Sequence, residues 1–261
     1  LGTGKPCQDY TFSGIYGEVG FGAVSDGCSS GRHTDIGSRV ITLSTAAFFK
    51  QLTLSAYGDV SEIKKDAVVM QTKLIGLAKE SLGLEMVDML ATSSYVCLSP
   101  LGGFVHLRGD GAVAIVYRNG QTDLYSYQWN KNTPFYPAYI EDSCASFIKE
   151  HGGDLNAQAV RVEHWLNQPG EKIVKVEEDI MSLGEGISGA SHYFHPEEVQ
   201  NTLAFVAVFT DGVNQMASTD GGSYIIPWQE VVQELIGLKN LNGEFVKRNA
   251  IWLIKEMRKK N

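Results

Sequence analysis

Apolar residues recur at intervals of three and four positions in two early segments, which predicts two consecutive amphipathic helices. The first runs from Thr34, the expected N-cap, to Gln51. Its apolar face consists of Ile36, Val40, Leu43 and Ala47. The second surrounds an apolar face made of Ile63, Ala67, Met70, Leu74 and Leu77.

Short runs rich in β-branched and aromatic residues predict strands in most of the remaining chain. They occupy residues 20–25, 90–98, 104–107, 112–117, 124–129 and 203–210. Turn signals at Gly109-Asp110-Gly111 and Asn119-Gly120 predict that residues 104–129 form a meander of antiparallel hairpins. Because a sheet must cover its apolar face, this order favours an α+β fold with helices packed outside two stacked sheets.

Residues 130–200 are rich in Gly and Pro, which predicts long loops, an insert or a flap there, with room for a helix over residues 140–151. We expect residues 243–260 to form a helix, because the basic side chains in its last turn interact favourably with a helix C-terminus. No internal repeat or low-complexity tract divides the chain, so we expect residues 1–261 to form a single domain.

The charge narrows the choice of partners. The 261 residues carry a formal charge of −8 without a dense block of Lys or Arg, which argues against nucleic acid and anionic membranes as partners and favours cations as ligands. No run of apolar residues is long enough to span a bilayer and no leader is evident, so we expect a cytoplasmic protein. The four cysteines form no C-x-x-C pair, which favours reduced thiols over a zinc site or a disulfide framework.

Three Asp residues follow or connect apolar strands and are each followed by glycine. Asp26-Gly27 ends the run Ala23-Val24-Ser25, and Asp211-Gly212 ends the run Val206 to Thr210. Hard divalent cations take oxygen ligands, which carboxylates at strand ends present on a rigid frame. The alternative is that Asp-Gly only makes a turn, and for Asp110, between two predicted hairpin strands, the turn interpretation is the stronger one.

Taken together, four motifs resemble those of metal-dependent type 2C Ser/Thr protein phosphatases of the bacterial-type branch. In order they are Gly4-Lys5-Pro6-Cys7-Gln8-Asp9, Val24-Ser25-Asp26-Gly27-Cys28-Ser29-Ser30, Arg108-Gly109-Asp110-Gly111 and Val208-Phe209-Thr210-Asp211-Gly212. The resemblance implies a four-layer α-β-β-α sandwich of two antiparallel sheets flanked by helices, with two Mn²⁺ or Mg²⁺ ions at one end of the sheets.

The resemblance also implies roles for single residues. Asp26 would bridge two metal ions, the Gly27 carbonyl would bind one of them, and Asp211 would bind the other. Asp9 would orient a metal-bound water that attacks phosphorus in line, so no protein nucleophile is needed.

Some positions depart from the family pattern. Cys28 stands where the family commonly has a His, a proposed general acid, and Asn214 stands where many members have a further acid that helps to hold a third ion with an acid like Asp110. Asn214 therefore counts against a third ion. Lys5 is the only cation near a motif that often carries a phosphate-gripping Arg. Members usually end with one more strand bearing a metal-binding Asp, and we expect such a strand to begin beyond Asn261.

Other candidates have ordinary interpretations. His192 and His195 could line a cleft or be exposed loop histidines, and a Cys28–His33 nucleophile and base would need a phosphate-cradling loop that this sequence lacks. The tryptophans are expected to anchor the core or an interface.

Two functional hypotheses follow. The first is an enzyme that hydrolyses phosphoserine and phosphothreonine on proteins, with a cognate kinase as a further candidate partner. The second is a catalytically weak or inactive module of the same fold that binds a phosphoprotein or another partner without turnover.

Overall fold

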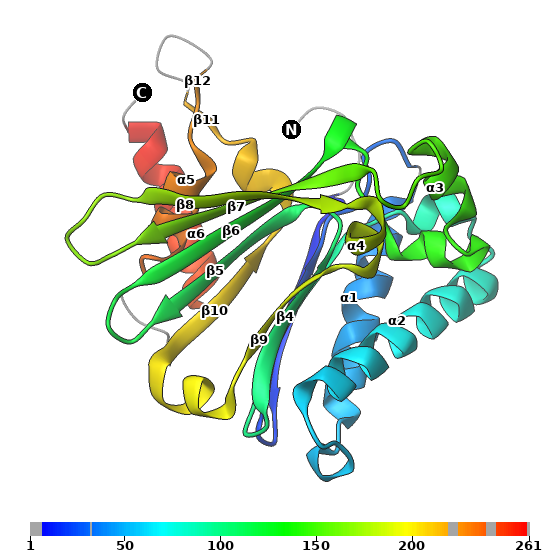
Figure 1. The fold of residues 1–261 in the computed structure, drawn as a ribbon, viewed down its shortest axis with the longest axis horizontal. Coiled ribbons are helices and arrows are strands. Elements are labelled where there is room, and N and C mark those ends of the chain that lie inside the picture. Colours follow the sequence, from blue (N-terminus) through cyan, green and yellow to red (C-terminus); the bar gives the residue numbers. More distant parts are fainter. Residues whose placement is uncertain (1–6, 32, 219–223, 239–243, 260–261) are drawn as a thin grey trace.

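A computed structural model describes residues 7–31, 33–218, 224–238 and 244–259, which form two five-stranded antiparallel sheets, a short β-ribbon and the helices around them (Figure 1). The first sheet has the order β1-β2-β3-β4-β9. Its strands are β1 (Tyr10–Tyr16), β2 (Val19–Ser25), β3 (Ser93–Ser99), β4 (Gly102–Arg108) and β9 (Ala190–Phe194).

The second sheet has the order β10-β5-β6-β7-β8. Its strands are β5 (Gly111–Tyr117), β6 (Thr122–Trp129), β7 (Gln158–Asn167), β8 (Val174–Ser182) and β10 (Leu203–Phe209). The short strands β11 (Ala217–Ser218) and β12 (Tyr224–Ile225) pair only with each other.

Helices cover the outer face of each sheet, which confirms the expected four-layer α-β-β-α arrangement (Figure 1). Against the first sheet lie α1 (Thr34–Gln51) and α2 (Val60–Leu82), whose Ala46, Phe49 and Ile63 pack on Phe21, Tyr95 and Phe104. Against the second lies α5 (Trp228–Ile236), with α6 (Phe245–Lys259) beside it. Inward-facing residues of both sheets, including Val105, Leu107, Val113 and Tyr127, form the core between them.

Both early helices form over the predicted segments, but the faces they bury differ from the predicted ones. Leu43, Met70 and Leu77 are 43%, 38% and 59% exposed, whereas α1 buries Ile41, Ala46 and Phe49, and α2 buries Ile75 besides the predicted Ile63 and Ala67.

The ends of the two helices also differ from each other. Asp59 caps α2 by accepting hydrogen bonds from the backbone N–H groups of Ser61 and Glu62, and Gly83 ends the helix in the left-handed conformation, at φ 63°. Thr34, the expected N-cap of α1, is instead its first residue, and no side chain caps that helix. The Thr34 hydroxyl donates to the Cys28 carbonyl at 2.8 Å, so it stabilises the preceding loop.

The predicted meander over residues 104–129 is only half correct. β5 and β6 do form a hairpin around Asn119-Gly120, but β4 pairs with β3 and β9 in the first sheet whereas β5 pairs with β6 and β10 in the second. The Gly109-Asp110 turn is therefore the point where the chain crosses between sheets. An Asp-Gly turn indicates a reversal of direction, but it does not determine which sheet receives the next strand.

Residues 130–200, expected to hold loops or a flap, contribute β7, β8 and β9 to the two sheets. The expected helix over residues 140–151 is divided into a 3-10 turn (Pro137–Asp142) and α3 (Ala145–Glu150), because Ser143 and Cys144 adopt positive φ angles of 57° and 62°. A short helix, α4 (Leu183–Ser188), connects β8 to β9.

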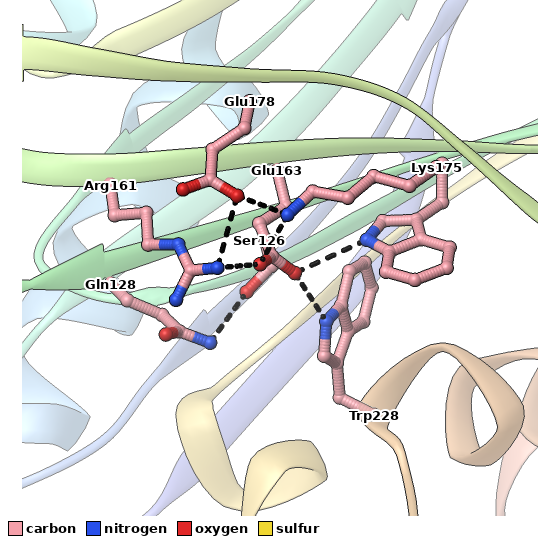
Figure 2. A network of polar contacts seen from close by, with 8 residues as sticks. Ser126, Gln128, Arg161, Glu163, Lys175, Glu178 and Trp228 are labelled. Carbon is pink, nitrogen blue, oxygen red and sulfur yellow. Dashed lines mark hydrogen bonds and ion pairs between the residues drawn. The ribbon is translucent and has the colours of Figure 1, made fainter.

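A buried carboxylate fastens α5 to the second sheet (Figure 2). Glu163 of β7 accepts hydrogen bonds from the indole N–H groups of Trp165, at 3.2 Å, and of Trp228, at 3.3 Å. Arg161 and Lys175 form ion pairs with the same carboxylate at 2.6 and 3.0 Å. Burial would raise the pKa of Glu163, but these hydrogen bonds and charges lower it, so the carboxylate is ionised near neutral pH.

The tryptophans and cysteines mostly follow expectation. Trp129 and Trp228 are buried, whereas Trp252 on α6 is 44% exposed and so does not belong to the core. All four cysteines lie in the described part of the chain, and none forms a disulfide. Within the described ranges, no helix combines the length and apolar character needed to cross a membrane.

Candidate metal centre

Strand pairing brings the predicted site residues to the same end of the two sheets. In the first sheet Tyr10 pairs with Ser25, so Asp9 and Asp26 come next to each other just beyond that pair. In the second sheet Phe209 pairs with Ala112, which places the Asp211 turn beside the crossing that carries Asp110. Because β4 runs directly into β5 at this crossing, the ends of both sheets meet there.

Asp26 lies at the centre of this group. Its half-buried carboxyl is within hydrogen-bonding contact of the carboxyls of Asp9 and Asp211. Burial, together with the hydrogen bonds and negative charges of these two neighbours, raises the pKa of Asp26 to about 9. Three acids that are far apart in sequence are therefore direct neighbours in space.

Asp110 is the most buried of the four acids, with 9% of its surface exposed. Burial and the negative charge of Asp211 raise the pKa of Asp110 to about 6, although a backbone hydrogen bond opposes the shift. Its closeness to Asp211 favours a role in the acidic group over the plain turn interpretation.

The acidic group has the chemistry of a cation site. Among the residues that the structure describes, the ion pairs involve none of Asp9, Asp26, Asp110 and Asp211. Clustered carboxylates that repel one another without a counter-charge fit a divalent cation.

The same described residues include no set of three His, Cys, Asp or Glu side chains gathered around a single ion position. Backbone carbonyls and water commonly complete the shell of an ion that one or two carboxylates hold. Mg²⁺ is commonly held in this way, because it dehydrates reluctantly.

Gly27 is required by close packing and not by a left-handed backbone. A Cβ atom at this position would lie 2.6 Å from the carbonyl oxygen of Thr34 and 2.9 Å from that of Gln8. The Gly27 N–H donates to the same Gln8 carbonyl at 3.2 Å. Glycine thus lets the segment after Asp26 pass between the start of α1 and the segment that leads into β1.

Thr92 holds Asp26 in place, and nothing in the sequence pattern indicated this residue. The Asp26 N–H donates to the Thr92 hydroxyl at 2.9 Å, and the Thr92 N–H donates to the Asp26 carbonyl at 2.8 Å. A Cβ atom at Gly109 would lie 2.6 Å from the Thr92 side chain. Thr92 therefore lies between the Asp26 and Asp110 turns, and its contacts depend on tertiary folding alone.

Comparison with known families identifies the family to which this chain belongs. The family described as Protein phosphatase 2C matches residues 1–245, which is most of the chain. This chain belongs to the protein phosphatase 2C family.

Solved structures support the phosphatase 2C fold. Serine/threonine phosphatase Stp1 from Staphylococcus aureus matches 98% of this chain and 86% of its own at a TM-score of 0.52 and 10% identity. A bacterial serine phosphatase bearing an R161K mutation matches 97% of this chain and 86% of its own at 0.51 and 10%. Identities this low concern the fold alone.

A Stage II Sporulation E family protein from Thermanaerovibrio acidaminovorans matches a smaller part of this chain. The match covers 42% of this phosphatase 2C family member and 50% of that chain, at 15% identity and a TM-score of 0.34. No curated protein matches the sequence significantly.

Cys28, a departure from the common phosphatase 2C pattern, lies beside the acidic group with its sulfur 3.0 Å from the Ser30 hydroxyl. Burial raises the pKa of Cys28, but hydrogen bonds from Ser30, Tyr136 and the backbone of Ser30 and Gly31 outweigh it, so the pKa is lowered. Tyr136 was not predicted from sequence, because it comes from the distant segment after β6.

The remaining residues singled out from the sequence lie in different environments. His192 lies on β9 between the sheets, where its Nε2 is 2.5 Å from the Tyr127 hydroxyl, and His195 is exposed beyond the end of that strand. The Asn214 side-chain oxygen is buried without a hydrogen-bond partner. Lys5 lies outside the described residues.

Proposed function

We propose that this protein removes phosphate from phosphoserine and phosphothreonine on proteins, using two Mn²⁺ or Mg²⁺ ions held by Asp26, Asp211 and the Gly27 carbonyl. The contact of Asp26 with both Asp9 and Asp211, without a paired cation among the described residues, carries the proposal. Family membership adds to it independently.

Each acid has a distinct part in this proposal. Asp26 contacts both neighbouring carboxylates and would bridge the two ions, whereas Asp211 would hold one of them. Asp9 is exposed and would orient the attacking water. Asp110 is buried beside Asp211 and would adjust the charge around the Asp211 ion or bind it directly.

When bound, the ions would supply water that is deprotonated near neutral pH and would offset charge on the phosphoryl oxygens. The chain itself holds the acids at fixed strand ends, so little reorganisation is needed. Phosphorylated proteins as substrates, a cognate kinase and a cytoplasmic location remain predictions of this proposal.

The test is turnover of a phosphothreonine peptide with added Mn²⁺. Activity should depend on Mn²⁺ or Mg²⁺ and should be lost in excess chelator. Cys28→Ser should keep most of the activity, because water and not the thiol is the nucleophile. Full activity in chelator, or a folded but inactive Cys28→Ser protein, would contradict the proposal.

The second candidate is a binding module of the same fold with little turnover. Cys28 and Asn214 favour it, because each replaces a residue that the family commonly uses in catalysis or metal binding. Binding of a phosphopeptide to the Mn²⁺-loaded protein, without phosphate release under conditions that load the metal, would support the module over the enzyme.

A further inference from the structure

A second polar cluster lies on the helix-facing side of the first sheet, around Arg108 at the end of β4. Side chains alternate along a strand, so Arg108 shares a face with His106 and Phe104, and Phe104 packs with the α1 and α2 cluster. Val105 and Leu107 point the other way, into the core between the sheets. Arg108 is therefore on the opposite face of β4 from Val105 and Leu107, although Phe135 of the same core cluster lies near its guanidinium group.

Arg108 is 8% exposed, and its Nε and Nη1 atoms are buried without a hydrogen-bond partner. The guanidinium group is a donor that stays charged in proteins, and buried donors are nearly always satisfied. Its nearest ring contact is Phe135, whose ring centroid lies 6.0 Å from the guanidinium carbon. An aromatic ring at that distance replaces neither missing hydrogen bond.

Two further buried polar atoms beside Arg108 also lack partners. They are the hydroxyl of Tyr95 and Nε2 of His106, whose residues are both 1% exposed. Tyr95 and His106 pair across β3 and β4 with ring centroids 5.4 Å apart, and both interact electrostatically with Arg108. The three unsatisfied groups are thus neighbours.

Gly189 confirms how closely these groups are packed. A Cβ atom there would lie 2.6 Å from Cε1 of His106 and 3.0 Å from Cγ of Arg108. The His106 Nδ1 atom lies 2.9 Å from the Ser191 hydroxyl, and the ring also forms a hydrogen bond to the backbone of Ala190. The donors of the cluster that have no acceptor are therefore those of Arg108 and Tyr95.

The cluster carries the positive charge of Arg108. Among the described residues no carboxylate forms an ion pair with Arg108, and the groups that favour its charged form are Tyr95 and Cys144. Burial and the positive charges of Arg108 and Lys64 lower the pKa of His106 and keep its ring neutral. Buried water could satisfy the donors, but it would not neutralise a buried cation.

We propose that Arg108 and Tyr95 bind a small inorganic anion such as chloride beside the His106 ring. Donors without acceptors, around a buried positive charge, match the chemistry of an anion and exclude a metal cation. The site differs from the acidic group in chemistry, because it presents donors and a cation whereas that group consists of carboxylates.

The direct test is a crystal of the protein soaked in sodium bromide, because bromide scatters anomalously and replaces chloride. The expected result is an anomalous peak in contact with the Arg108 guanidinium. Ordered water at this position, without a bromide peak, would overturn the proposal.

A solution test uses thermal melts at constant ionic strength, with sodium chloride replacing sodium methanesulfonate. The melting temperature of the parent should rise with chloride and saturate, and Arg39→Met, which removes an exposed guanidinium from α1, should behave in the same way. Arg108→Met should show no chloride response, and a response equal to that of the parent would overturn the proposal.

Tyr95→Phe provides a second variant if Arg108→Met does not fold, since it removes one donor and keeps the shape of the ring. Losing one hydrogen bond to a charged group should weaken the apparent chloride affinity about tenfold. An unchanged chloride affinity in Tyr95→Phe would count equally against the site.

Discussion

At the scale of the residue, the most informative side chain is Asp26, because its environment disfavours the ionised carboxylate. Burial and two neighbouring carboxylates all favour the protonated form of Asp26. A divalent cation reverses this preference by supplying the missing opposite charge. We therefore expect this side chain to weaken the metal-free protein and to be needed for the proposed metal binding.

Replacing Asp26 by Asn should separate these two effects. Removing the repulsion should raise the stability of the metal-free protein on the order of 1 kcal/mol, after allowance for the partial exposure of Asp26. Turnover should fall by roughly 100-fold or more, because a ligand of both ions is lost. Thermal melts of parent and variant, with and without Mn²⁺, and a phosphopeptide assay measure both effects.

Glu171→Gln is the control, since it removes an exposed acid from the loop between β7 and β8. It should leave the Mn²⁺ response and the activity unchanged. The plain turn interpretation of Asp26-Gly27 expects Asn to replace Asp without consequence. Equal stabilisation of the parent and Asp26→Asn by Mn²⁺ would support that interpretation.

At the scale of the element, close packing restricts the choice of residue more at the junctions between elements than within the strands. Gly27, between β2 and the loop before α1, allows a close approach to Thr34 and Gln8 that no other residue permits. Gly20, within β2, has no atom within 4 Å of the position a Cβ would take, and its φ is not left-handed. Substitutions of these two glycines can therefore be compared directly, since one position is closely packed and the other is open.

Gly27→Ala should therefore cost roughly 1–3 kcal/mol of stability, because backbone atoms must move to admit the methyl group. Gly20→Ala should be neutral or stabilising by up to about 0.5 kcal/mol, since it restricts the unfolded chain. Urea unfolding of both variants measures the difference. Equal stabilities of the two proteins would show that the junction is not tightly packed.

The attachment of α5 allows a second comparison of matched variants. Glu163 and Glu178 both contact Arg161 and Lys175, but only Glu163 accepts from the two indoles (Figure 2). Glu163→Gln should cost about 2 kcal/mol, because the neutral amide accepts less strongly and directs an NH₂ group at other donors. Glu178→Gln should cost less than about 0.5 kcal/mol, as expected for an exposed ion pair.

Urea unfolding followed by tryptophan fluorescence measures both changes. A similar loss in both variants would mean that the ion pairs, and not the indole hydrogen bonds, hold α5 to the second sheet.

At the scale of the whole molecule, the acidic group forms only when the ends of both sheets meet. Asp9 and Asp26 come from the first sheet and Asp211 follows the last strand of the second, so the unfolded chain has no comparable site. A ligand of this group binds the native state alone and stabilises it.

Mn²⁺ should therefore raise the melting temperature of the parent in a saturable way. At a concentration 100 times its dissociation constant, one ion should add about 2.7 kcal/mol to the free energy of unfolding. Excess chelator should reverse the shift. A melting temperature independent of Mn²⁺, in a protein that calorimetry also shows not to bind it, would rule out the metal centre.

The sequence by itself determined the local features of this protein: the two early helices, though not the faces that they bury, six of the strands, and the acids placed at or between strand ends. These follow from periodicity and turn chemistry, which act over a few residues. The motifs also predicted the family and four-layer fold that the comparisons and the structure confirm.

Only the tertiary structure decided that the Asp110 turn crosses between sheets, that β7, β8 and β9 arise from the Gly- and Pro-rich region, and that Thr92 and Tyr136 adjoin the acidic group. It also decided that Arg108 is buried and, within the described ranges, forms no ion pair with a carboxylate. Strand pairing and electrostatic environment depend on residues distant in sequence, so no local pattern contains them.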